Sequence, residues 1–137
     1  MMQRLGSGTI TTTADVDTLA FDWGTIHMLS EPLVTGAQRH SFGVTEVLPG
    51  GGHGRHNHPG AEEIIYVLSG EGEQMVDDQP PVRIGPGSCV FIPDGVYHST
   101  FNVGSESMRL IIIYAPAGSE RLLREIPGCQ ILPPEKE

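Results

Sequence analysis

The sequence lacks long apolar segments, cysteine pairs and an excess of basic residues. No apolar run in its 137 residues approaches the roughly 18 residues of a membrane-spanning helix, and the N-terminus lacks the apolar stretch of a secretory signal. Eight lysines and arginines oppose seventeen acidic residues, giving a net charge of −9. Binding to nucleic acid or to an anionic membrane is therefore not expected. We predict a cytoplasmic protein without nucleic-acid or membrane partners.

Only two cysteines are present, Cys89 and Cys129, and they stand far apart in the chain. Such a pair gives neither a disulfide framework nor the spacing of a zinc ribbon. Cys89 lies within an apolar segment, residues 88–92, that has the character of a strand. This setting predicts that Cys89 is a small buried hydrophobic residue rather than a reactive thiol.

Glycine and proline are abundant, with eighteen and eleven residues, and they recur as turn-forming dipeptides along the chain. Short segments rich in β-branched residues lie between these turns, a pattern typical of an all-β sandwich or barrel. A length of 137 residues fits one domain with its own core. The predicted strands are residues 9–13, 24–29, 42–48, 54–58, 63–68, 74–77, 88–92, 97–101 and 109–114.

The two ends of the chain have a different character from its middle. The first 22 residues predict one or two edge strands. Residues 119–125 predict a short helix with Glu120 in its first turn, and Pro127 and Gly128 end it. The remaining tail, residues 129–137, is predicted to lie on the surface.

The most informative stretch is residues 50–63, which contain two histidines followed by a glutamate. His56 and His58 are two positions apart, and in an extended strand such residues point to the same face. Glu63 follows five residues after His58, and His98 lies in a second patterned stretch 40 residues after His58. Imidazole and carboxylate are the usual ligands of Mn, Fe, Co, Ni, Cu and Zn. These four residues are the predicted metal ligands.

The two stretches resemble the paired motifs of the cupin superfamily. The first motif reads G-x5-H-x-H-x(3,4)-E-x6-G, and the second reads G-x5-P-x-G-x2-H-x3-N. Both are complete here, in order, as Gly50, His56, His58, Glu63 and Gly70, then Gly87, Pro93, Gly95, His98 and Asn102. Glu62 also fits the shorter spacing from His58, but only Glu63 places Gly70 at the right distance.

The resemblance implies a double-stranded β-helix, that is, a jelly-roll barrel, with a short C-terminal helix. It covers about residues 42–115, which we expect to form the barrel core of a single domain over residues 1–137. Residues 1–41 would supply N-terminal edge strands, and residues 116–137 the helix and the tail. We also expect a homodimer, because proteins of this family often pair through their sheets and exposed edge strands need covering.

Three imidazoles and one carboxylate leave two positions open on an octahedral ion. Those positions can hold water, a bidentate substrate, or a substrate together with dioxygen. Nitrogen and oxygen ligands without thiolate suit Mn(II) or Fe(II), with Ni, Co, Cu or Zn as alternatives. We expect one divalent transition metal ion per chain.

Other residues are weaker candidates for the site. Tyr114 and Gln74 would face the cavity if the strand register allows, and a tyrosine near a metal can act as a general acid or base. Strand alternation points Tyr66 away from the cavity and places His53 opposite His56, in a loop or on the outer face.

Three arginines, Arg55, Arg83 and Arg109, are candidates for binding a substrate carboxylate in a bidentate manner. Exposure to solvent is the alternative for each of them, and we prefer it for Arg83. The walls of the cavity are expected to be mainly apolar.

The resemblance leaves several functions open, because one fold supports many activities. A small-molecule enzyme of the dioxygenase type is the first hypothesis. The alternatives are a metal-dependent isomerase, lyase or decarboxylase acting on a sugar-like or carboxylated substrate, and a non-catalytic module that binds a small ligand.

Overall fold

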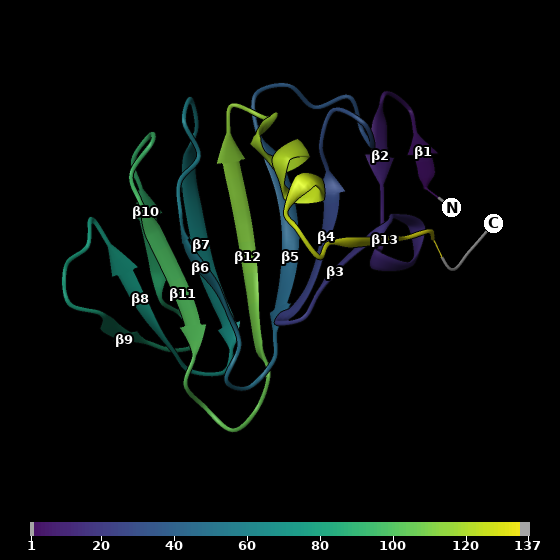
Figure 1. The fold of residues 1–137 in the computed structure, drawn as a ribbon. Coiled ribbons are helices and arrows are strands. Elements are labelled where there is room, and N and C mark those ends of the chain that lie inside the picture. Colours follow the sequence, from purple (N-terminus) through teal and green to yellow (C-terminus); the bar gives the residue numbers. More distant parts are fainter. Residues whose placement is uncertain (1, 135–137) are drawn as a thin grey trace.

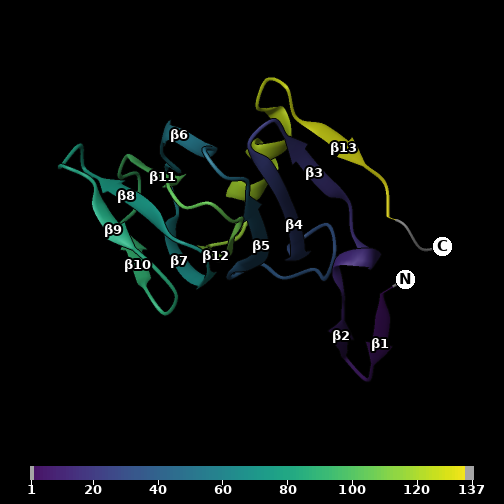
Figure 2. The same cartoon turned by 90° about the horizontal axis from the view of Figure 1, so that it is seen from below.

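The chain folds into two antiparallel β-sheets that face each other, as the computed structural model of residues 2–134 shows (Figure 1). A separate two-stranded hairpin, β1 (Gln3–Leu5) and β2 (Gly8–Ile10), projects from one end (Figure 2). The larger sheet has the order β10 (Cys89–Ile92), β7 (Glu62–Ser69), β12 (Met108–Ala115), β5 (Ser41–Val47), β4 (Gly24–Ser30), β3 (Thr18–Phe21) and β13 (Gln130–Leu132). The smaller sheet has the order β6 (Gly52–His56), β11 (His98–Asn102), β8 (Gly72–Val76) and β9 (Val82–Ile84).

The predicted jelly-roll architecture is confirmed, and each predicted strand overlaps an observed one. Four observed strands lie outside the nine predicted strand ranges, namely β1, β3, β9 and β13, although β1 and β3 fall within the first 22 residues, where one or two edge strands were predicted. Each has only three or four residues, too few for alternation to show in the sequence. The tail contains a strand, because β13 pairs with β3 along Gln130–Leu132. Residues 135–137 of the predicted tail lie outside the described part of the chain.

The described residues also form two short 3-10 helices, η1 (Thr13–Asp15) and η2 (Ser119–Glu125). The second has the predicted bounds of the C-terminal helix, and Leu123 anchors it in the core. Within residues 2–134 no helix is both long enough and apolar enough to cross a membrane.

Strict alternation along β7 and β12 builds the core between the two sheets. In β7 every second side chain is buried, including Ile65 and Val67, and in β12 the same holds for Leu110 and Ile112. Because the side-chain period of a strand is two, this alternation also turns Glu63 and Tyr114 inward. The hydrophobic pattern that builds the core therefore also delivers two polar groups to the interior.

Asn102 fastens the end of β11 to the larger sheet. Its buried amide nitrogen donates to the Val47 carbonyl over 2.9 Å and to the Glu106 carbonyl over 2.7 Å. Its Oδ1 accepts from the Gly104 amide over 2.9 Å. Three hydrogen bonds made by one buried side chain fix the strand that begins with His98.

Cys89 is exposed, so the prediction that it is buried is wrong. In β10 the side chain of Ile92 points into the core, and alternation therefore turns both Phe91 and Cys89 towards solvent or onto the outer face. The strand is apolar on both faces, so its sequence does not reveal which residues face the core.

A thiol reagent should therefore modify Cys89 in the native protein. We expect one thiol per chain to react within minutes with Ellman's reagent, followed by absorbance. Cys129 should react more slowly, because it is half-buried and burial raises its thiol pKa. The Cys89→Ser variant should lose the fast phase. A wild-type protein that reacts only after denaturant is added would contradict the exposed position.

Candidate metal centre

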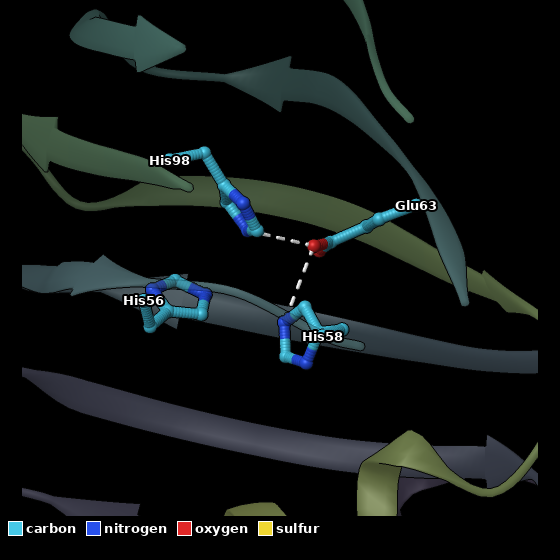
Figure 3. A group of neighbouring side chains, drawn as sticks. All are labelled: His56, His58, Glu63 and His98. Atoms are coloured by element: carbon cyan, nitrogen blue, oxygen red, sulfur yellow. Dashed lines mark ion pairs between the residues drawn. The ribbon is translucent and has the colours of Figure 1, made fainter. Parts of the chain in front are cut away.

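Four side chains, three from strands of both sheets and one from a loop, converge between the two sheets (Figure 3). His56 ends β6, His98 begins β11, and Glu63 lies in β7 of the opposite sheet. His58 follows two residues after β6. Each of the four offers one ligand atom, and these atoms all lie within 4.8 Å of one another. The structure thus brings together the predicted ligand set.

The two neighbouring histidines converge for a different reason from the one predicted. They were expected to share one strand, but β6 ends at His56 and His58 lies in the following loop. This loop is fixed by the Asn57 side chain, which donates to the Gly95 carbonyl over 3.0 Å. The Ala61 amide also donates to the His58 carbonyl over 3.1 Å. His58 is therefore buried by the shape of a loop rather than by strand alternation.

Backbone carbonyls set the tautomers of two histidines. Nδ1 of His56 lies 2.6 Å from the Gly54 carbonyl oxygen, and Nδ1 of His98 lies 3.0 Å from the Val96 carbonyl oxygen. A carbonyl oxygen can only accept, so Nδ1 carries the hydrogen in both rings. Each neutral ring then presents the lone pair of Nε2, the arrangement found in metal-binding histidines.

Three buried atoms at the centre have no hydrogen-bond partner among the described residues: Nε2 of His58, Nε2 of His98 and Oε1 of Glu63. Glu63 Oε1 lies 2.9 Å from His98 Nε2 and 3.4 Å from His58 Nε2 (dashed in Figure 3). With Nε2 of His98 unprotonated, the shorter contact brings two acceptors together. Buried polar atoms are nearly always paired, so this group fits a cation bound among its lone pairs. Its imidazole and carboxylate donors suit a single divalent transition metal.

Burial also sets the charge of these groups. Burial, together with repulsion from neighbouring histidines, lowers the pKa of His56 and of His58 to about 3. Both rings are therefore neutral at pH 7, the form that binds a metal. Burial raises the pKa of Glu63, against the opposing effect of the neighbouring His98 ring. A bound cation would stabilise the ionised form of Glu63.

His53 faces the site, so the prediction that it lies in a loop or on the outer face is wrong. In the pairing of β6 with β11, His98 lies opposite His56 but Thr100 lies opposite His53. Three steps along β6 thus match two along β11, and this β-bulge reverses the alternation. The flanking glycines, Gly52 and Gly54, are the sequence signal that could have revealed it.

His53 belongs to a row of stacked rings. Its ring centroid lies 3.7 Å from that of His56, with an interplanar angle of 16°. On its other side Trp23 lies at 5.3 Å and 15°, and Phe21 stacks on Trp23 at 4.8 Å and 9°. We call Phe21, Trp23, His53 and His56 the ring stack.

Tyr114 is brought to the site, as the sequence suggested. It is buried, pairs with Glu63 across β7 and β12, and places its ring centroid 4.7 Å from that of His58. Burial raises its pKa well above 10, and the carboxylates of Glu63 and Glu120 raise it further. Tyr114 therefore keeps its proton at neutral pH.

Gln74 is buried but lies behind a residue that lines the cavity. Thr100 lines the cavity and donates from Oγ1 to Gln74 Oε1 over 2.5 Å. The Gln74 amide donates to the Met75 carbonyl over 3.1 Å. Gln74 thus holds Thr100 in place.

None of the three candidate arginines lines the cavity. Arg109 is exposed on the outer side of β12, in a hollow with His27 and Glu46. Its outward position follows from alternation, because it lies five residues before the inward Tyr114. Arg55 pairs with Asp78 at 2.8 Å, and Arg83 pairs with Glu71 at 3.1 Å, both on the surface. The hypothesis that an arginine binds a substrate carboxylate in this cavity is therefore wrong.

The cavity beside the four ligands is small, about 40 Å³. Its inner walls are apolar, formed by Ile26, Val47, Ile65, Leu110 and Ile112. The polar groups in its lining are Glu63, three histidines (His53, His56 and His98), Thr45, Thr100 and Tyr114. The expected mainly apolar walls are present.

Known families and proteins share parts of this sequence. The family model described as Cupin domain matches residues 43–114, just over half of the chain. Protein SchB of Streptomyces halstedii is 37% identical over 94 residues, which cover 68% of this chain and 67% of SchB. Dimethylsulfoniopropionate lyase DddQ of Ruegeria pomeroyi is 44% identical over 57 residues, which cover 42% of this chain and 28% of the lyase.

A solved structure shares the fold. It is described as a predicted oxalate decarboxylase of Thermotoga maritima, and it superposes with a TM-score of 0.69 at 21% identity. The superposition covers 78% of this chain and 98% of that chain. At this identity the likeness concerns the fold alone.

Proposed function

Because the chain belongs to the cupin family, we propose that it is an enzyme that binds one divalent transition metal ion and acts on a small organic molecule. The proposed ligands are His56, His58, Glu63 and His98. The observation that supports this most strongly is the convergence of Nε2 lone pairs, fixed by backbone carbonyls, on the buried Glu63 carboxylate. Mn and Fe are the metals we expect first.

Lewis-acid activation of a substrate oxygen is the chemistry that such an ion supplies when bound. The chain's own residues supply a protonated hydroxyl and apolar surroundings. Tyr114 provides a buried hydroxyl that keeps its proton, beside His58. The apolar walls formed by Ile65, Leu110 and Ile112 keep water away from the reacting atoms.

Proton-transfer chemistry, of the lyase, isomerase or decarboxylase type, is the reaction class that we favour. Tyr114 is the reason, because its buried hydroxyl keeps its proton and can donate a hydrogen bond to an oxyanion that develops during proton transfer elsewhere on the substrate. One relative that shares a segment of this chain is named as a lyase. Dioxygenase chemistry is the second candidate, because a nitrogen and oxygen donor set without thiolate also suits Fe(II).

The decisive experiment measures metal content and oxygen uptake together. The protein is purified without a metal-affinity column, analysed by mass spectrometry, and incubated with diols, diketones, phenols and small carboxylates. About one metal ion per chain and substrate turnover without oxygen consumption would support proton-transfer chemistry. Oxygen consumed in step with substrate would establish the second candidate instead. A protein that binds no divalent metal after reconstitution would overturn the proposal.

Replacing Tyr114 with phenylalanine should lower kcat by about 100-fold or more, the usual contribution of a hydrogen-bond donor to a developing oxyanion. The phenyl ring retains the packing against His58, so metal content should stay unchanged. Steady-state kinetics and metal analysis of the same preparation give both values. Tyr66→Phe is the matched control, because Tyr66 is 39% exposed on the outer face of β7. Equal kcat values for the two variants would contradict a catalytic role for Tyr114.

A further inference from the structure

The cavity reaches solvent beside three residues of the ring stack, Trp23, His53 and His56. Of the residues that line the cavity, only Trp23, His53 and His56 are partly exposed, and the others are buried. A molecule that enters from solvent therefore passes Trp23 and His53 before it reaches the ligand atoms.

The opening is preformed. The Trp23 carbonyl accepts from the Leu48 amide over 2.9 Å, which ties this residue to the end of β5. Gly51 packs directly on Trp23, since a Cβ at that glycine would lie 3.0 Å from the Trp23 Cβ. His53 is held between the rings of Trp23 and His56. These contacts give a rigid aromatic surface.

The interior is too small for most metabolites. A volume of about 40 Å³ holds roughly three water-sized groups, given 10–15 Å³ for each. The atoms that reach the metal centre would fill this space. The rest of a larger substrate must lie in the opening, against Trp23 and His53.

No basic side chain is placed to select the outer part of the substrate by its charge. Among the residues described, no lysine or arginine lines the cavity, and Arg55 and Arg83 are engaged with surface carboxylates. An acidic or hydroxyl group of the substrate must therefore be recognised by the metal centre. The outer part of the substrate is then selected by its contact with the rings of Trp23 and His53.

We infer that Trp23 and His53 select substrates whose outer part is flat and unsaturated, such as an aromatic ring or a conjugated enol, attached to an oxygen-bearing group. This inference rests on the proposed function, because the oxygen group requires a metal. The faces of Trp23 and His53 pack on other rings within the ring stack, so a substrate ring meets their edges. The face of a flat unsaturated ring attracts such edges in an edge-to-face arrangement, whereas a puckered saturated ring has no π face to offer.

The test compares three carboxylates by calorimetry on protein reconstituted with Mn(II). Benzoate is flat, cyclohexanecarboxylate has the same charge but a puckered ring, and formate reaches the metal without touching the opening. Benzoate should bind about threefold to tenfold more tightly than cyclohexanecarboxylate, the usual contribution of one aromatic pair. Trp23→Leu should remove this preference, and Trp23→Phe should retain it. Formate affinity should be equal in all three proteins.

His53→Leu provides a second route if Trp23→Leu does not fold, and it should weaken the preference for benzoate in the same way. Equal affinity of the wild-type protein for benzoate and cyclohexanecarboxylate, with formate still bound, would overturn this inference alone. An unchanged preference in Trp23→Leu and His53→Leu would overturn it as well. Failure to bind Mn(II) at all would instead overturn the proposed function.

Discussion

Replacing His58 with alanine should reduce the bound metal from about one ion per chain to a trace. The imidazole is one of four donor groups whose atoms lie within 4.8 Å of one another, and among the described residues no further His, Cys, Asp or Glu belongs to this group. Removing a residue that only hydrogen-bonds to a metal ligand lowers metal affinity about 10- to 100-fold. Removing a ligand itself should therefore lower the affinity by more than about 100-fold. Mass spectrometry and a competitive chelator titration measure the effect.

His40→Ala is the matched control, because His40 is exposed and lies outside the group of four. It should keep the metal content and the affinity of the wild-type protein. If His58→Ala retained one ion per chain with unchanged affinity, His58 would not be a ligand. The same comparison made with His98→Ala would then show whether the whole group had been misassigned.

Replacing Gly24 with alanine should destabilise the fold severely. Gly24 has a φ of +155°, and a Cβ at this position would overlap the backbone carbonyl oxygen of Glu46 in the paired strand β5. Neither backbone can move far without breaking the register of Gly24 with Val47. We expect a loss of about 3 kcal/mol or more in the free energy of unfolding, measured by urea denaturation.

Gly85→Ala is the control for this change, because a Cβ at Gly85 would meet nothing within 4 Å. Its unfolding midpoint should stay close to that of the wild-type protein. Equal midpoints for the two variants would show that β4 and β5 do not pack closely at Gly24. Gly24 also adjoins Trp23, so any folded Gly24→Ala protein should show altered Trp23 fluorescence.

The residues of the metal centre could be found from the sequence because their spacing is encoded locally. His56, His58 and Glu63 lie within eight residues, and their pattern together with His98 indicates the site without knowledge of the fold. The jelly-roll followed from short strands between turns and from the paired motifs. The predicted ligation and the dimer stay predictions.

Errors arose where the direction of a side chain depends on partners distant in sequence. His53 was misplaced because a bulge is a property of two paired strands, and the sequence of one strand cannot show its register. Cys89 was misplaced because β10 is apolar on both faces. The error at Arg109 was avoidable, because an odd separation from Tyr114 on one regular strand already excludes a shared face.

The bulge in β6, as well as residue identity, is a determinant of the site. A strand of the same length without the bulge would still allow His56 to pair with His98. Regular alternation over the three residues from His56 back to His53 would then turn His53 to the solvent side, away from Trp23. Loss of the bulge alone could thus remodel the entrance while every proposed metal ligand was retained. Homologues with identical motifs but without this bulge should be expected to differ in the substrates they admit.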